Sequence, residues 1–393
     1  MGDWWGDYGR DVRNIQGGNS SDYIDPAAYD WNKFRSYNIA GNGGDDKIFG
    51  GRRNNNISGG DGQDYINTLR GGNNTVDGGN GDDWLELAGD NKAKGGNGQD
   101  RIDIYGYGKN DVFGEEGDDE INVFGGRDNY INGGNGNDRL YAGGDSNNTL
   151  VGEGGDDRFK VENRGNNNID GGDGNDDVRM RGDNSNIVNT GNGDDYVVAD
   201  NNGPNKIDAG DGNDRVDITG KGDNLVNAGN GDDLVLVSGE GNNTVYGGDG
   251  NDILDARDSK NGVYLNGGKG DDRIIGGSGS DTIYTGSGNN DVTAGPGNDR
   301  VVAEGGSNNR IRTGEGNDTI DVKRGSSNDI NAGGGYDTVR FEGNMSDYNR
   351  YNKDDAVTYT HRDSGKATTL RGVETVQFDD RVVDIEPHDH HDH

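Results

Sequence analysis

A nine-residue pattern, Gly-Gly-x-Gly-x-Asp-x-φ-x with φ an apolar residue, recurs along this chain from about Gly41 to Arg340. The segments 133–140 and 247–254 are two clear copies. Such a short unit cannot bury a core of its own, so a long series of copies must bury apolar residues by stacking. The chain is therefore predicted to form a single elongated solenoid rather than a set of globular domains.

The aspartate is the sixth residue of each copy and sets the register. Successive aspartates are mostly 19 residues apart, with one spacing of 17, one of 20 and an initial 18. Midway between them lies a degraded copy with Asn at the sixth position, so each coil is predicted to contain one Asp half-turn and one Asn half-turn. The aspartates are Asp46, Asp64, Asp83, Asp100, Asp119, Asp138, Asp157, Asp176, Asp195, Asp214, Asp233, Asp252 and Asp272. The residues between them are Asn55, Asn74, Asn91, Asn110, Asn129, Asn148, Asn167, Asn186, Asn205, Asn224, Asn243 and then Gly262.

An apolar residue follows two positions after each sixth-position Asp or Asn, and these apolar residues support the same register. Side chains alternate between the two faces of a strand, so the eighth residue of each copy is predicted to point inward. Ala93 is the one small residue among them and lies in the 17-residue coil, so a local distortion is expected near Asn91. The inward residues are Ile48, Ile57, Ile66, Val76, Leu85, Ala93, Ile102, Val112, Ile121, Ile131, Leu140, Leu150, Phe159, Ile169, Val178, Val188, Val197, Ile207, Val216, Val226, Val235, Val245, Leu254 and Tyr264.

The pattern shifts after Asp272. The next aspartate, Asp281, follows by only nine residues, which is half a coil, so it falls in the former Asn row. The later sixth positions are Asn290, Asp299, Asn309, Asp318, Asn328 and Asp337, and their inward residues stay apolar. We therefore predict that the aspartate row crosses to the opposite edge of the solenoid near residue 275.

These copies resemble the RTX (repeats-in-toxin) nonapeptide of secreted calcium-binding proteins, over roughly three quarters of the chain. The resemblance implies an all-β fold, a parallel β-roll or β-solenoid of about 16 coils. It also implies calcium ions between same-side turns of successive coils, held by main-chain carbonyls and by the aspartates of both rows. Thirteen aspartates in the first row and four in the second leave about 15 gaps for Ca²⁺, which would nearly balance the net charge of −35.

The residue types suit this chemistry. Calcium takes about six to eight oxygen ligands in flexible geometry. Glycine allows positive φ and lets a turn direct its carbonyls toward one point, and Asp adds a carboxylate. Asn in the alternate half-turns keeps a neutral carbonyl but loses the charge. Those residues are interpreted as a hydrogen-bonded amide ladder, with simple turn preference or calcium binding as the alternatives.

Composition narrows the possibilities further. A chain with 27% hydrophobic residues, 77 Gly and a net charge of −35 resembles a disordered protein, so an external stabiliser such as calcium is expected. The negative charge disfavours nucleic acid as a partner. There is no Cys, so nothing depends on disulfides.

The sequence lacks an apolar leader at its start and any stretch resembling a membrane span. In the RTX family an absent leader is expected, because members leave Gram-negative cells by type I secretion with an uncleaved C-terminal signal. A secreted or cell-surface location is therefore predicted.

Four regions are predicted. Residues 1–40, with Trp4, Trp5 and Trp31, form an N-terminal capping or assembly segment, and residues 41–340 form the calcium-binding roll. Residues 341–386 resemble the β-rich segment that closes many RTX proteins. Residues 387–393 form a His/Asp tail, His388 to His393, which could bind zinc or nickel weakly, mediate contacts or have no specific role.

Three functions remain open. No metalloprotease, serine-hydrolase or phosphate-loop motif occurs, so an enzyme is not expected. The first hypothesis is a secreted, calcium-stabilised structural protein of a surface layer, filament or matrix. The second is a polysaccharide- or surface-binding adhesion module, and the third is a non-catalytic secretion module of an enzyme system. The second would use a stripe at the seventh positions, unless that stripe is only a solvated face: Tyr65, Trp84, Arg101, Arg139, Arg158, Tyr196, Arg215 and Arg273.

Overall fold

The structure is a computed structural model that describes residues 12–26, 36–306 and 308–385. Within these ranges the chain is all β apart from a short 3₁₀ helix, η1 (Met345–Asp347). It divides into two compact units, residues 1–192 and residues 193–393, which are described in turn. Both are parallel β-solenoids, of about 16 turns together, as the sequence predicted.

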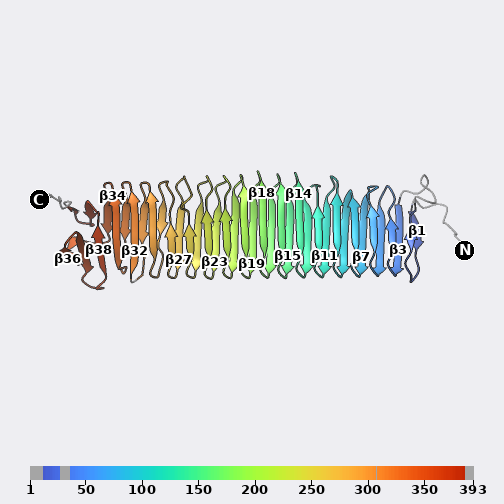
Figure 1. The fold of residues 1–393 in the computed structure, drawn as a ribbon, viewed down its shortest axis with the longest axis horizontal. Helices are drawn as coiled ribbons and strands as arrows, with labels where there is room; N and C mark the ends of the chain where they lie inside the picture. The colour runs from blue at the N-terminus through green and yellow to red at the C-terminus, as the bar shows by residue number, and fades with distance from the viewer. Residues whose placement is uncertain (1–11, 27–35, 307, 386–393) are drawn as a thin grey trace. The chain divides into compact units, whose positions relative to one another are not determined.

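In the first unit each coil gives one strand to sheet A and one to sheet B, and neighbouring strands within each sheet run parallel (Figure 1, blue to green). Sheet A contains β1 (Val12–Gln16), β3 (Ser36–Gly43), β5 (Asn55–Asp61), β7 (Asn73–Asn80), β9 (Asp90–Asn97), β11 (Asn110–Glu116), β13 (Asn129–Asn135), β15 (Asn148–Gly154), β17 (Asn167–Asp173) and β19 (Asn186–Asn192). Sheet B contains β2 (Tyr23–Ile24), β4 (Lys47–Phe49), β6 (Tyr65–Thr68), β8 (Trp84–Ala88), β10 (Arg101–Tyr105), β12 (Glu120–Val123), β14 (Arg139–Gly144), β16 (Arg158–Asn163) and β18 (Asp177–Gly182).

The second unit repeats this arrangement and ends in antiparallel strands. Its sheet A contains β21 (Asn205–Asp211), β23 (Leu225–Asn230), β25 (Thr244–Asp249), β27 (Tyr264–Lys269), β29 (Thr282–Tyr284), β31 (Arg300–Ala303), β33 (Thr319–Val322), β35 (Thr338–Phe341), β39 (Thr375–Gln377) and β40 (Val382–Asp384). Its sheet B contains β20 (Tyr196–Asn201), β22 (Arg215–Ile218), β24 (Leu234–Val237), β26 (Ile253–Asp255), β28 (Arg273–Ile275), β30 (Asp291–Pro296), β32 (Asn309–Glu315), β34 (Asn328–Gly334), β36 (Tyr348–Lys353), β37 (Ala356–His361) and β38 (Ala367–Arg371).

The core of each unit lies between its two sheets. Side chains alternate in and out along each strand, so the inward residues stack coil upon coil, as Ile102 does on Ile121. Every predicted inward residue except Tyr264 is buried. The structure also buries a second inward position on sheet B, two residues further on, which includes Leu87, Ile104 and Val161.

The prediction for Tyr264 is wrong by one residue. Thr244 pairs with Tyr264 and Val245 with Leu265, so Leu265 points inward and Tyr264 outward. Val263, rather than Gly262, occupies the sixth position, because its amide donates to Asp281 Oδ1 as the aspartates do in their own row. The extra residue of this coil therefore lies before Val263.

The register is otherwise more regular than expected. The predicted distortion near Asn91 is confined to the turn before it, since β9 itself pairs residue by residue with both β7 and β11 and Ala93 is buried. The shortened coil loses its residues in the turn before β9 instead, where Gly89 alone joins β8 to β9.

The predicted crossing of the aspartate row is confirmed. Strand β29, which follows Asp281, pairs with β27 in sheet A. Strand β30, which follows Asn290, pairs with β28 in sheet B. The Asp turns thus lie at one edge of the second unit up to Asp272 and at the other edge from Asp281 onward.

The roll begins earlier than residue 41. Strand β1 pairs with β3 and β2 pairs with β4, both parallel and in register, so residues 12–24 belong to the solenoid and not to a separate segment. Trp4, Trp5 and Trp31 lie outside the described residues, as does the tail from His388 to His393.

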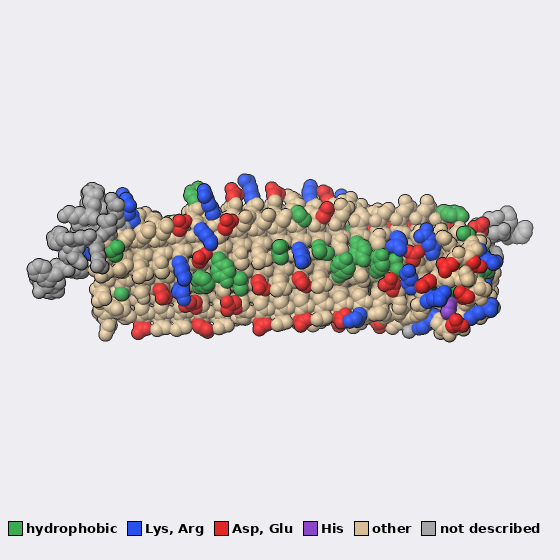
Figure 2. Space-filling view, turned by 180° about the vertical axis from the view of Figure 1, so that it is seen from behind, with side chains coloured by type: hydrophobic (Ala, Val, Ile, Leu, Met, Phe, Trp, Pro, Cys, Tyr) green, Lys and Arg blue, Asp and Glu red, His purple; other side chains and the backbone are tan. Residues whose placement is uncertain are grey.

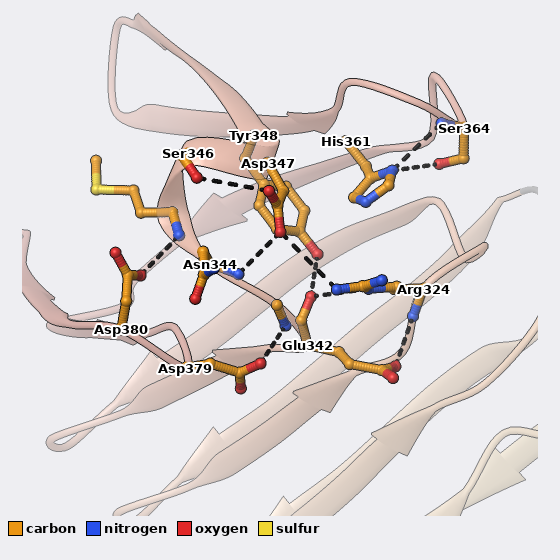
Figure 3. A network of polar contacts seen from close by, with 12 residues as sticks. Arg324, Glu342, Asn344, Ser346, Asp347, Tyr348, His361, Ser364, Asp379 and Asp380 are labelled. Carbon is orange, nitrogen blue, oxygen red and sulfur yellow. Dashed lines mark hydrogen bonds and ion pairs between the residues drawn. The ribbon is translucent and has the colours of Figure 1, made fainter.

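The C-terminal segment closes the second unit. Strands β36, β37 and β38 form an antiparallel sheet whose last strand pairs with β34, while β39 adds to β35. Phe341, Tyr348, Tyr359 and Phe378 pack ring against ring beneath it. Figure 3 shows polar contacts around this cluster, in which Tyr348 donates its hydroxyl to the Glu342 carbonyl at 2.8 Å.

Candidate metal centres

Glycine makes the Asp turns possible. In the turn before Asp138, Gly134 and Gly136 have φ of 113° and 131°, which side-chain-bearing residues rarely adopt. A β carbon on Gly136 would lie 2.1 Å from the Gly117 carbonyl oxygen of the preceding coil. Successive turns therefore stack with their backbones in close approach, and each sixth residue is held directly beside the one before it.

The aspartates of these turns form buried rows. Each of the seventeen predicted aspartates is at most 3% exposed. One carboxylate oxygen, Oδ1, accepts the amide of the sixth residue in the preceding coil, as in Asp119 N to Asp138 Oδ1 at 2.8 Å. Within the first unit this links Asp46 through Asp176. In the second unit it links Asp195 through Asp272 at one edge and Asp281 through Asp337 at the other.

The second oxygen, Oδ2, is buried without a hydrogen-bond partner among the described residues in most members of the rows. Asp281 differs, because its Oδ2 accepts the Gly277 amide at 2.7 Å. A buried carboxylate oxygen with no partner is costly and calls for a cation or a proton. The orphaned oxygens belong to Asp46, Asp64, Asp83, Asp100, Asp119, Asp138, Asp157, Asp214, Asp233, Asp252, Asp272, Asp299, Asp318 and Asp337.

Burial shifts the protonation of these groups. Loss of solvent, with repulsion from neighbouring aspartates of the row, raises the pKa of Asp83 and Asp119 to about 8. Burial also raises the pKa to about 7 in Asp138, Asp157, Asp214, Asp233, Asp272 and Asp299. At neutral pH the carboxyl groups of such a row therefore need either a proton or a cation as a counter-charge.

A main-chain carbonyl shares the space beside each orphaned oxygen. A β carbon on Gly59 would lie 2.1 Å from Asp64 Oδ2 and 2.4 Å from the Gly78 carbonyl oxygen, and Gly114 repeats this geometry with Asp119 and Gly133. Carboxylate and carbonyl oxygens are the ligands of hard cations such as calcium. In the described part of the chain no three acidic or His side chains gather as a metal cluster, so the carbonyls would supply the remaining ligands.

The sites are not all alike. Most of the Asp turns begin with Gly, but six begin with a fully buried Ala or Thr: Thr190, Ala209, Ala228, Ala294, Thr313 and Ala332. Their β carbons occupy the position at which, next to Asp64, a β carbon on Gly59 would lie only 2.1 Å from Oδ2. These turns therefore offer less room beside the carboxylate.

Comparison with known families identifies the repeat. The RTX calcium-binding nonapeptide repeat matches residues 40–71, 70–91, 104–140, 142–160, 163–179, 218–237, 235–259 and 266–301, just over half of the chain. The chain belongs to this RTX repeat family. No curated protein matches the chain.

Membership of the RTX repeat family indicates which ion the chain binds. RTX repeats bind calcium, so the chain is a calcium-binding protein. Proteins with these repeats are typically secreted, and the repeat itself is typically non-catalytic. Within the described residues, no helix is both long and apolar enough to cross a membrane.

The Asn row is chemically distinct from the Asp rows. The Asn residues are buried, and along most of the row each side-chain amide donates to the next, as in Asn110 Nδ2 to Asn129 Oδ1 at 2.9 Å and Asn129 Nδ2 to Asn148 Oδ1 at 2.8 Å. Asn243 Nδ2 donates to the Gly241 carbonyl instead, and Asn290 Nδ2 has no partner among the described residues. The predicted amide ladder is therefore confirmed. Because the amide oxygens already accept hydrogen bonds, this row presents no orphaned oxygens like those of the Asp rows.

The sequence reasoning missed the ends of the rows. Asp22 donates its amide to Asp46 Oδ1, and Asp337 donates its amide to Glu374 Oε2. Residues 17–24 are a copy with Ser20 in place of Gly, which was the available signal. Glu374 lies 37 residues after Asp337, so the 19-residue spacing of the aspartates could not have revealed it.

The seventh-position residues lie on strands of sheet B, with side chains that are exposed or half-buried. Several are paired with carboxylates two residues along the same strand, including Arg101 with Asp103 at 2.8 Å and Arg215 with Asp217 at 2.9 Å. This pairing agrees with a solvated, charge-balanced face at those positions.

Proposed function

We propose that this chain is a secreted, non-catalytic structural protein whose roll folds on calcium and forms part of an extracellular surface layer, filament or matrix. The observation that carries the proposal is the rows of buried aspartates, in which most Oδ2 atoms lack a hydrogen-bond partner among the described residues. Without a cation the rows are either repulsive or protonated. Calcium at the roughly millimolar levels outside cells suits weak extracellular modules, and its scarcity inside would leave the chain unfolded for export.

The wider composition supports a structural role. The solenoid and the C-terminal segment that closes it account for nearly all the described residues, so this part of the chain is built as one repeated structure. A solenoid also has long faces, which favour contacts with other copies.

Electron microscopy in calcium and in chelator tests the proposal. Filaments or sheets that form only with calcium are the expected result. Particles that remain single in calcium at high protein concentration would overturn the assembly role. Circular dichroism of the same samples shows whether folding itself has occurred.

A further inference from the structure

The last coil of the second unit is completed by a part of the chain that carries no copy of the repeat. Residues 342–385, here called the closing segment, leave the roll after β35 and return to it with β38 and β39. Strand β38 extends sheet B beside β34, and β39 extends sheet A beside β35. The turn between β38 and β39 therefore stacks on the turn that contains Asp337, at the edge of the second aspartate row.

This last turn is shorter than the turns of the roll. Where the roll places six residues, 332–337, between its paired strand residues, the closing segment places three, 372–374. Gly372 permits the tight path, with a φ of 59°. A β carbon on Gly372 would lie 3.1 Å from the Gly333 carbonyl oxygen, so the two turns are in close contact.

Glu374 takes the sixth position of this turn. Thr375 pairs with Thr338, so the residue before Thr375 corresponds to Asp337. Glu374 Oε2 accepts the Asp337 amide at 2.6 Å, in the same way as Asp337 Oδ1 accepts the Asp318 amide at 2.8 Å. Glutamate is one methylene longer than aspartate, which lets its carboxylate reach this amide from the shorter turn.

Asp337 brings an unsatisfied oxygen to the gap between the two turns. Its side chain is fully buried, and its Oδ2 has no hydrogen-bond partner among the described residues. On the same edge, Asp281 directs its Oδ2 toward the following coil: a β carbon on Gly276 would lie 2.4 Å from that oxygen and 2.2 Å from the Ala294 carbonyl oxygen. By the same register Asp337 Oδ2 faces the closing segment, where Gly372 stands in the place of Ala294.

Within the described residues, no basic side chain pairs with these two carboxylates. Charged side chains of both signs crowd the surface at the C-terminal end (Figure 2, right), but the ion pairs there join other residues, such as Arg381 and Asp380 at 3.2 Å. Burial, with repulsion from Asp318 and Glu374, raises the pKa of Asp337 to about 6. A buried carboxylate without a partner needs a cation once the pH exceeds that value.

We propose that a calcium ion lies in the gap between Asp337 and Glu374 and fastens the closing segment to the last coil of the roll. The donors fit this ion, because calcium takes carboxylate and main-chain carbonyl oxygens in flexible geometry. The site differs from those of the repeat, since its second acid is a glutamate on a segment without the nonapeptide. The ion needs both the roll and the closing segment, so it couples the two.

The ion acts on one edge of the closing segment and not on its interior. The stacked rings of Phe341 and Phe378, 5.2 to 5.5 Å from their aromatic neighbours, pack without any contribution from the carboxylates. Without calcium the segment therefore keeps this packing, but repulsion between Asp337 and Glu374 loosens the 372–374 turn. The inference concerns a single chain and does not depend on the proposed assembly.

Native mass spectrometry tests the site by counting the calcium ions on single chains. Glu374→Gln keeps an oxygen for the Asp337 amide but removes the charge. Glu342→Gln is the matched control, because Glu342 belongs to the same segment, is exposed and accepts the Arg324 amide at 3.3 Å (Figure 3). Both variants are measured at pH 8, above the Asp337 pKa of about 6, so that a proton does not replace the ion.

We expect Glu374→Gln to bind one calcium ion fewer than the wild type, and Glu342→Gln to bind the same number. Hydrogen exchange of residues 367–377 in calcium should be about tenfold faster in Glu374→Gln, because the turn is no longer held. The double variant, Asp337→Asn with Glu374→Gln, should bind as many ions as Asp337→Asn alone, since both residues serve one gap.

Other outcomes overturn the site. If Glu374→Gln binds as many ions as the wild type, or Glu342→Gln loses an ion as well, the proposal is wrong. A lost ion with unchanged exchange would mean that the ion does not fasten the segment. Circular dichroism verifies folding, and Asp337→Asn, with the same expected rise in exchange, replaces Glu374→Gln if that variant does not fold. Because these measurements use single chains, failure here leaves the proposed assembly standing, and a lack of filaments leaves the site standing.

Discussion

The two oxygens of each row aspartate have separate tasks. In Asp138, Oδ1 accepts the Asp119 amide and fixes the turn, while Oδ2 is buried and lacks a partner among the described residues. Asn would preserve the first task and abolish the second. The Asn row shows this directly, since its Oδ1 atoms accept backbone amides while its Nδ2 atoms build the ladder.

Replacing Asp138 by Asn separates these tasks. We expect Asp138→Asn to keep the backbone bond but lower the number of calcium ions bound per chain by one or two and raise the calcium concentration needed for folding. Asp156→Asn removes the same charge from an exposed neighbour and should leave the ion count unchanged. The ratio of calcium to protein after dialysis is the measurement, and equal losses in both variants would contradict a role for Oδ2.

Acid should substitute in part for calcium. The pKa of Asp119 is about 8 and that of Asp138 about 7 in the folded chain, against 3.8 ordinarily. Between about pH 4 and pH 8 the folded chain therefore binds more protons than the unfolded chain. Stability of the calcium-free fold is therefore greatest below about pH 4 and is lost as pH rises toward 7 to 8. The affinity for calcium should decrease as the pH falls, because protons compete with calcium for the carboxylates.

Circular dichroism of calcium-free protein between pH 8 and pH 4 tests this. We expect β-structure to appear on acidification. Adding salt at pH 8 screens exposed charges without protonating the rows and should not restore the fold. Restoration by salt alone would mean that general repulsion, and not the buried rows, prevents folding.

Among the elements, the strands were more predictable than the turns. Alternation of apolar residues placed nearly every inward side chain, and a nine-residue step placed the row crossing before Asp281. The error at Tyr264 arose in a turn lengthened by one residue, where polar and glycine residues on both sides hide the insertion. The orphaned state of Oδ2 could not be foreseen either, because it depends on which atom faces the neighbouring coil.

The Asn ladder should contribute measurably to stability at its own edge. Asn129→Ala would remove Asn129 Oδ1, which accepts both the Asn110 amide and Asn110 Nδ2, and would leave Asn148 Oδ1 with Ser146 Oγ as its remaining side-chain donor. We expect a loss of about 1–3 kcal/mol, the usual result of stranding buried polar groups. Urea unfolding in saturating calcium measures it.

Asn135→Ala is the matched control. Its exposed amide donates to Glu116, and surface changes of this kind stay within about 0.5 kcal/mol. Similar losses in the two variants would argue that the buried ladder has no special contribution.

At the scale of the whole molecule, charge and fold depend on each other. A net charge of −35 opposes compaction, and the aspartates that contribute to it are the residues that divalent ions would neutralise. The hydrophobic core alone contributes little to stability, because each coil buries only a few aliphatic side chains. We propose that calcium between the coils supplies the missing stabilisation.

Far-ultraviolet circular dichroism during a calcium titration at neutral pH, begun in chelator, tests this central claim most directly. We expect a coil-like spectrum in chelator and a cooperative change to β-structure as calcium is added, reversed by fresh chelator. A stable β spectrum in chelator at neutral pH would contradict the account, because the buried aspartate rows would then be tolerated without a cation.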